Sequence, residues 1–119
     1  MTLLGAWRTV ANSLRMGDNT LWVILIEKCG AESRRIPFVN PPARNVLPLR
    51  YIAQQALRHD VAAVALIRPA ADEHCTPCAG ELGAVHAMRA TLGPIGLALH
   101  DYILWRGNRC RSLRLAGQL

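Results

Sequence analysis

A continuous apolar run from Val61 to Ile67 constrains the fold of this chain more than any other feature. It follows almost directly on the segment Leu47 to His59, whose apolar residues recur at helical spacing. A strand that is apolar at every position is typical of the centre of a sheet with both faces covered. We therefore expect an α/β domain with this run as its central strand and a helix packed beside it. The apolar face of that helix would comprise Leu49, Ile52, Ala53, Ala56 and Leu57.

Two hairpins are predicted on either side of this unit. Asn19 to Glu27 and Arg34 to Val39 have strand composition and are separated by a turn at Cys29-Gly30. Leu97 to Trp105 and Cys110 to Leu113 follow the same pattern near the end of the chain. Together with the central strand, these segments predict a mixed β-sheet flanked by helices.

A further helix is predicted from about Cys78 to Leu92, with Gly93 as a left-handed cap and Pro94 stopping the helix. At the other end of the chain, residues 1–18 have the pattern of an amphipathic helix and not of a cleavable signal sequence. With 119 residues, 51% of them hydrophobic, we expect one domain spanning 1–119: the N-terminal helix 1–18 and a core 19–119.

Composition limits the partners and the compartment. The apolar runs are far shorter than the ~20 residues that cross a bilayer, so no membrane partner is expected. Four cysteines, Cys29, Cys75, Cys78 and Cys110, are too few and too dispersed to replace a core, and we interpret them as reduced thiols of a cytoplasmic protein.

Arginine supplies nearly all of the basic residues, and the net charge is +6. Arg106, Arg109, Arg111 and Arg114 all follow the last acidic residue, Asp101. Such a cluster fits either a solvated strand face or a phosphate-binding patch, so a nucleic-acid partner stays open.

Four segments stand in a particular order along the chain: Pro48 to Pro69, Thr76-Pro77-Cys78, Leu99-His-Asp-Tyr-Ile-Leu104, and Ser112-Leu113 through Gly117. Their order resembles the RadC-type branch of the JAB/MPN (JAMM) domains. That family has an Ala-rich helix and a strand leading into His-Asn-His-Pro-Ser-Gly-Asp, then Thr-Pro-Ser, and ends with an Asp-His-Ile strand and a serine-containing strand. The resemblance covers roughly Asn19 to Leu119 and implies a three-layer fold of the cytidine-deaminase-like type.

The same resemblance implies a zinc ion held by two histidines and an aspartate, a glutamate base and a serine that supports the oxyanion. Such a site needs three protein ligands and an open position. In this chain Asn19 stands at the glutamate position, Leu66 and Arg68 at the histidines, Cys78 at the serine and Glu81 at the aspartate. Zinc is therefore not expected at the family site. Tyr102, which replaces the family histidine after Asp101, would remove one more polar group.

Arg68 has two interpretations. It could pair with Glu81 and fill the former metal cavity, or it could bind an anionic ligand at the start of the helix that begins near Cys78.

The segment from His74 to Cys78 offers the alternative ligands His74, Cys75 and Cys78, with Glu81 in reach, for a rebuilt zinc site. A redox dithiol and ordinary loop cysteines are the other interpretations of this segment.

Three functions from different classes remain. The first is a catalytically inactive JAB-like domain that binds a partner protein or a second copy of itself. The second is a zinc-dependent amide or isopeptide hydrolase with the rebuilt Cys/His site. The third is a nucleic-acid-binding accessory of the kind that the DNA-repair label of the RadC family suggests.

Overall fold

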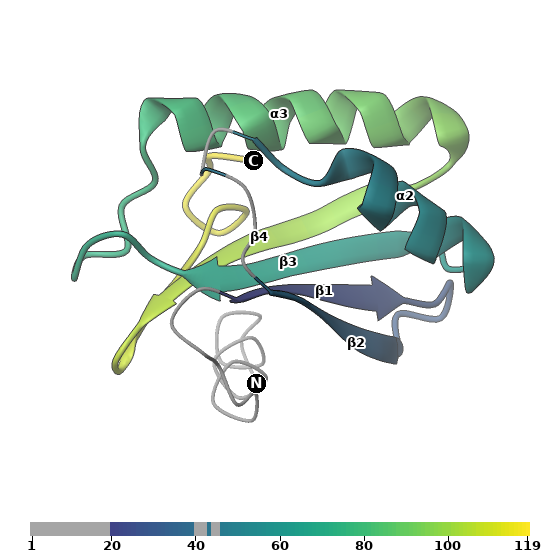
Figure 1. The fold of residues 1–119 in the computed structure, drawn as a ribbon, viewed down its shortest axis with the longest axis horizontal. Helices are drawn as coiled ribbons and strands as arrows, with labels where there is room; N and C mark the ends of the chain where they lie inside the picture. Colours follow the sequence, from purple (N-terminus) through teal and green to yellow (C-terminus); the bar gives the residue numbers. More distant parts are fainter. Residues whose placement is uncertain (1–19, 40–42, 44–45) are drawn as a thin grey trace.

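The computed structural model describes residues 20–39, 43 and 46–119. Within them a five-stranded sheet with strand order β2-β1-β3-β4-β5 carries two helices (Figure 1). The elements are β1 (Thr20–Ile26), β2 (Glu32–Val39), α2 (Leu49–Arg58), β3 (Ala63–Pro69), α3 (Ala79–Leu92), a 3₁₀ turn η1 (Gly93–Ile95), β4 (Ala98–Arg106) and β5 (Arg109–Ser112).

The predicted central strand is confirmed as β3, which begins at Ala63, two residues later than expected. It pairs antiparallel with β1 and parallel with β4, so the sheet is mixed. The parallel pair requires a crossover, and α3 supplies it. Both predicted hairpins are present, β1–β2 and β4–β5.

Both described helices lie on the same face of the sheet (Figure 1). The α/β class with a mixed sheet is thereby confirmed. The predicted N-terminal helix 1–18 and Asn19 lie outside the described residues, so the three-layer JAB/MPN arrangement stays a prediction. No helix in the described ranges is long and apolar enough to cross a membrane.

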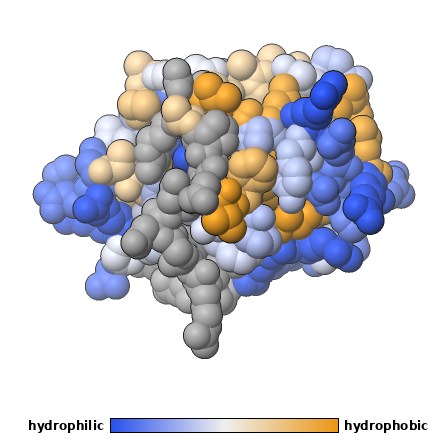
Figure 2. Space-filling model, in the orientation of Figure 1, coloured by the Kyte–Doolittle hydropathy of each residue, from blue (hydrophilic) through white to orange (hydrophobic). Residues whose placement is uncertain are grey.

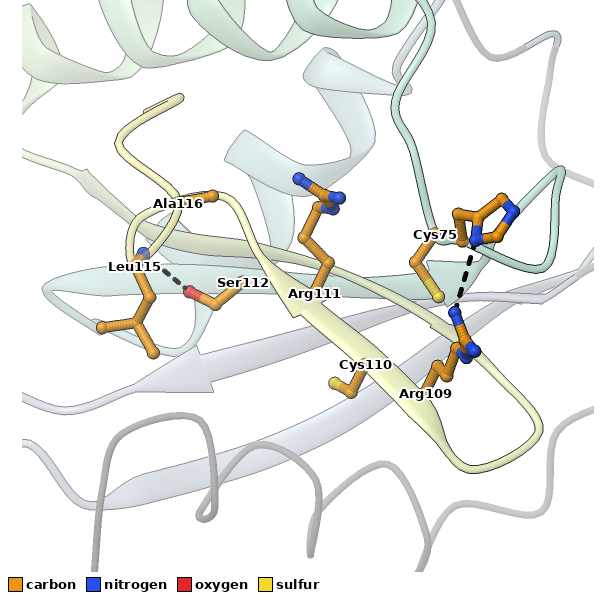
Figure 3. Close-up of a pocket in the computed structure, with 8 residues that line it drawn as sticks. Cys75, Arg109, Cys110, Arg111, Ser112, Leu115 and Ala116 are labelled. Carbon is orange, nitrogen blue, oxygen red and sulfur yellow. Dashed lines mark hydrogen bonds between the residues drawn. The ribbon is translucent and has the colours of Figure 1, made fainter.

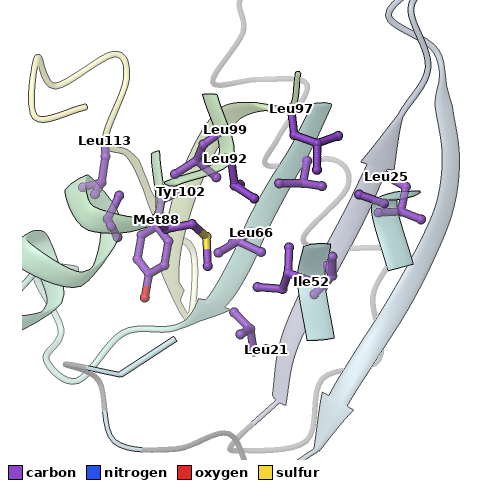
Figure 4. Packing of buried hydrophobic residues seen from close by; sticks show 14 of the residues in the cluster. Leu21, Leu25, Ile52, Leu66, Met88, Leu92, Leu97, Leu99, Tyr102 and Leu113 are labelled. Atoms are coloured by element: carbon purple, nitrogen blue, oxygen red, sulfur yellow. The ribbon is translucent and has the colours of Figure 1, made fainter. Parts of the chain in front are cut away.

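The pleat divides the apolar side chains between the two faces of the sheet. The larger cluster lies between the sheet and the helices (Figure 4), and it contains Leu21 and Leu25 of β1, Ile52 of α2, and Leu66. A smaller cluster on the opposite face contains the alternating partners Ile24, Ile26, Ala65, Ile67 and Ile103.

Two local predictions are wrong. Leu57 is 60% exposed, although it was placed on the apolar face of α2; it lies about 100° round the helix from the buried Ala56, which turns it away from the sheet. Gly93 is not a left-handed cap, because its φ is −52° and the chain continues into η1. Pro94 fits the first turn of that short helix, and Gly96, at φ +81°, makes the left-handed turn instead.

Candidate functional site

The end of β3 and the start of α3 bring three polar side chains into the core. Leu66 and Arg68 are two residues apart in β3, so both face the helices. The parallel register pairs Leu66 with Tyr102 of β4, and Glu81 lies in the first turn of α3. Arg68 is 3% exposed, Glu81 1% and Tyr102 0%. We call Arg68, Glu81 and Tyr102 the buried polar cluster.

A short hydrogen bond connects two members of this cluster. The Tyr102 hydroxyl donates to Oε2 of Glu81 at 2.6 Å. Burial raises the pKa of Tyr102 far above its usual value near 10, and the charge of Glu81 and this hydrogen bond raise it further. The adjacent Arg68 guanidinium acts in the opposite direction on the same pKa. Tyr102 is thus a neutral donor between an acidic and a basic side chain.

Arg68 does not form the expected ion pair with Glu81: among the described residues no salt bridge joins them. The Tyr102 hydroxyl donates to the Glu81 carboxylate, and the Arg68 guanidinium is close enough to the same hydroxyl to lower its pKa. The Arg68 atom Nη1 is buried, and no described residue accepts a hydrogen bond from it. A buried guanidinium nitrogen that has no acceptor among the described residues is costly.

Sequence reasoning missed Tyr102 as a polar member of the site. The resemblance predicts the loss of a polar group at this position, whereas the Tyr102 hydroxyl donates to the Glu81 carboxylate within the buried polar cluster. The signal that could have found it is the parallel pairing of β3 with β4, which places Tyr102 beside Leu66 on the helix-facing side.

Cys78 caps α3. It is the N-cap residue, with extended backbone angles, and its sulfur accepts a hydrogen bond from the Glu81 amide at 3.3 Å. Serine is a common N-cap residue. Cys78, which stands where the resemblance implies a serine, therefore has a structural role as the cap of α3.

The described residues do not fit the zinc site that the resemblance implies. Leu66 has no donor atom, and Arg68 carries a permanent positive charge in place of a neutral imidazole. The carboxylate of Glu81 already accepts the Tyr102 hydroxyl. Nowhere in the described part of the chain do three or more His, Cys, Asp or Glu side chains gather as metal ligands.

The alternative ligands His74, Cys75 and Cys78 lie in three different environments. Cys75 is 1% exposed, with φ +56°, and burial raises the pKa of its thiol. The His74 side chain is exposed and its Nδ1 lies 3.3 Å from Nη1 of Arg109. Cys78 faces outward at the start of α3. A thiol that is stabilised in its protonated form is a poor zinc ligand.

A second buried carboxylate fixes the end of the chain. Asp101 is 0% exposed and accepts hydrogen bonds from the amides of Tyr102 at 2.7 Å and Arg114 at 3.1 Å, and from the Ser112 hydroxyl. The same hydroxyl accepts from the Leu115 amide at 3.1 Å. These contacts join β4 and β5 to the C-terminal turn, so the Asp and Ser of the family-like ending have a structural role here.

No family model matches the chain, and no curated protein matches it closely enough to count as a relative. The resemblance to RadC-type domains therefore rests on the motif order given above.

Proposed function

We propose that this chain is a RadC-like JAB/MPN domain that has exchanged zinc hydrolysis for binding and acts as a catalytically inactive protein-interaction domain in the cytoplasm. The observation that carries the proposal is the buried polar cluster. It occupies the end of β3 and the start of α3, where the resemblance implies a metal, with an arginine, a tyrosine and a glutamate. An arginine that is 3% exposed is incompatible with a dication at the same position.

The free edges of the sheet support a binding role. β2 is the outer strand on one side, and most of its residues are exposed. β5, the outer strand on the other side, is only four residues long. Among the described residues no strand pairs with the outer edge of β2, which is eight residues long, and such an edge is the feature that strand-adding partners use. We propose that the partner, a second copy of the chain included, pairs with β2.

Two alternatives make different demands. A hydrolase with a rebuilt site requires His74, Cys75 and Cys78 to converge on zinc, and the described part of the chain shows no such gathering of three or more ligands. A nucleic-acid accessory would use the arginines of the β4–β5 hairpin, and its binding would weaken steeply with salt.

The test combines an activity assay with a mapping of the edge. The purified chain is incubated with zinc and with fluorogenic amide and isopeptide substrates, beside a Cys78→Ala variant. We expect no zinc-dependent turnover in either protein. Turnover that is lost in Cys78→Ala would contradict the proposal and favour the rebuilt hydrolase.

The edge is mapped by hydrogen exchange of the β2 amides as the protein concentration rises, with β1 amides as the internal reference. We expect exchange to slow in β2 while that of the already paired β1 stays constant. Exchange in β2 that does not depend on the concentration would remove the second copy as a partner.

A further inference from the structure

A groove of about 360 Å³ lies between β5 and the loop that precedes α3, away from the buried polar cluster (Figure 3). Arg109 and Arg111 are two residues apart in β5, so their side chains lie on the same side of the strand, about 6.7 Å apart along it. Figure 3 shows Arg109 reaching to His74 in the loop, whereas Arg111, on the same side of β5, contacts Gln118 near the C-terminus. The strand therefore contributes two guanidinium groups to the groove, and the loop contributes the imidazole of His74, whose Nε2 lies 3.9 Å from the Glu73 carboxylate.

The arginines of the groove are not neutralised within the described part of the chain. Neither Arg109 nor Arg111 forms an ion pair there. Arg109 contacts the imidazole of His74, and Arg111 makes only a long contact of 3.5 Å with Oε1 of Gln118. Two guanidinium groups that face one groove without a carboxylate repel each other, and an anion between them would relieve that repulsion.

The described residues that line the groove include no carboxylate. Burial raises the pKa of the Cys75 thiol, and Asp72 adds to the rise, while Arg111, Arg109 and Arg106 act against it. Cys75 therefore stays a neutral thiol at neutral pH. The nearby Asp72 already accepts hydrogen bonds from the amides of His74 and Thr76 through its Oδ1.

The two ends of the groove differ in chemistry. His74, Cys75 and Arg109 lie at one end and Leu115 and Ala116 at the other, with Arg111 between them (Figure 3). Leu115 is 53% exposed, so an apolar surface is available beside the cations. Figure 2 shows hydrophilic surface at the end of the molecule where the loop before α3 and the β4–β5 turn lie.

We propose that this groove binds a small molecule with a phosphomonoester at the Arg109–Arg111 end and an apolar or aromatic body against Leu115. A phosphate dianion offers three acceptor oxygens, enough to bond both guanidinium groups. The volume of about 360 Å³ lies in the range of small-molecule sites and is too small for a folded partner. This site is separate from the buried polar cluster and does not depend on the function proposed above.

The test uses phenyl phosphate, inorganic phosphate and phenol as probes, titrated into the full chain by NMR. The variant is Arg109→Gln/Arg111→Gln, and the matched control is Arg50→Gln/Arg58→Gln, which removes two exposed arginines from α2. We expect phenyl phosphate to bind more tightly than inorganic phosphate, and phenol not to bind. The groove variant should weaken both phosphates by about tenfold or more, with the control unchanged. Leu115→Ala should weaken phenyl phosphate and leave inorganic phosphate unaffected.

Three results would overturn the proposal. If both the groove variant and the α2 control bind phosphate more weakly by the same factor, the phosphates are attracted only by the net positive charge of the protein. Failure of phenyl phosphate to bind would mean that the groove has no phosphate site. A single-stranded oligonucleotide that binds more tightly than phenyl phosphate, with a steep salt dependence, would assign the groove to a nucleic-acid backbone. If the double variant does not fold, Arg109→Gln alone, at an exposed position, carries the same test.

Discussion

Replacing Tyr102 by Phe removes one oxygen atom from the centre of the buried polar cluster. The ring is 0% exposed, and its hydroxyl donates to the Glu81 carboxylate at 2.6 Å. Loss of a hydrogen bond to a buried charged group costs about 1.5–3 kcal/mol, and for a domain of this size that lowers the melting temperature by about 5–15 °C. Calorimetry and urea unfolding followed by circular dichroism measure both quantities.

The pH dependence supplies a second, more specific signature. The folded pKa of Tyr102 lies above its unfolded value near 10, because burial and Glu81 favour the neutral form. Its contribution is therefore fully present below pH 10 and is lost as the pH rises, since only the unfolded chain releases the proton. Above pH 10 the wild type should lose up to about 1.4 kcal/mol per pH unit from this residue, and Tyr102→Phe should not.

Tyr51→Phe is the matched control, because Tyr51 is half-buried and its ring packs on Phe38 with centroids 5.0 Å apart. It should change the free energy of unfolding by less than about 0.5 kcal/mol. The reasoning is refuted if Tyr102→Phe is as stable as the wild type, or if the two proteins lose stability equally above pH 10.

Two further predictions concern the frame around the site. Asp101→Asn replaces an acceptor of three hydrogen bonds by an amide and should cost about 2–3 kcal/mol, with faster hydrogen exchange at the Arg114 amide; unchanged exchange there would show that the carboxylate does not hold the C-terminal turn. Gly96→Ala introduces a side chain at φ +81° and should destabilise by about 1 kcal/mol, whereas Gly93→Ala, at φ −52° with no atom within 4 Å of the added Cβ, should be neutral or slightly stabilising; equal effects in urea unfolding would contradict the backbone assignment.

Hydrophobic patterning was sufficient to predict the central strand and the two hairpins of a mixed sheet, but not the strand order. The uninterrupted run to Ile67 marked the central strand, and two pairs of strand-like segments, the first separated by a turn at Gly30, marked the hairpins. These signals are local, and each is repeated over several residues. The conformation of a single residue has no such repeated signal. Gly93 and Gly96 lie three residues apart in one turn, and the hydrogen bonds of the 3₁₀ turn determine which of them adopts positive φ.

The candidate site was predicted only in part. The positions of Arg68 and Glu81 at the end of β3 and the start of α3 followed from the motif order, and both lie in the core. The participation of Tyr102 did not follow, because it depends on the register between β3 and β4. That register brings Tyr102 close to Arg68, which lies 34 positions earlier in the chain. The sequence indicated the arginine cluster that contains Arg109 and Arg111, but not that it meets the His74 loop in one groove, because β5 and that loop come together only in three dimensions.

The most direct measurement of the central claim is the metal content of the chain, purified without an affinity metal and analysed for zinc beside a Cys75→Ser/Cys78→Ser variant. A buried arginine at the expected ligand position, and a loop whose His74, Cys75 and Cys78 do not gather as ligands in the described residues, predict no stoichiometric zinc in either protein. About one zinc per chain in the wild type, lost in the double variant, would contradict the account and assign the loop to a metal site.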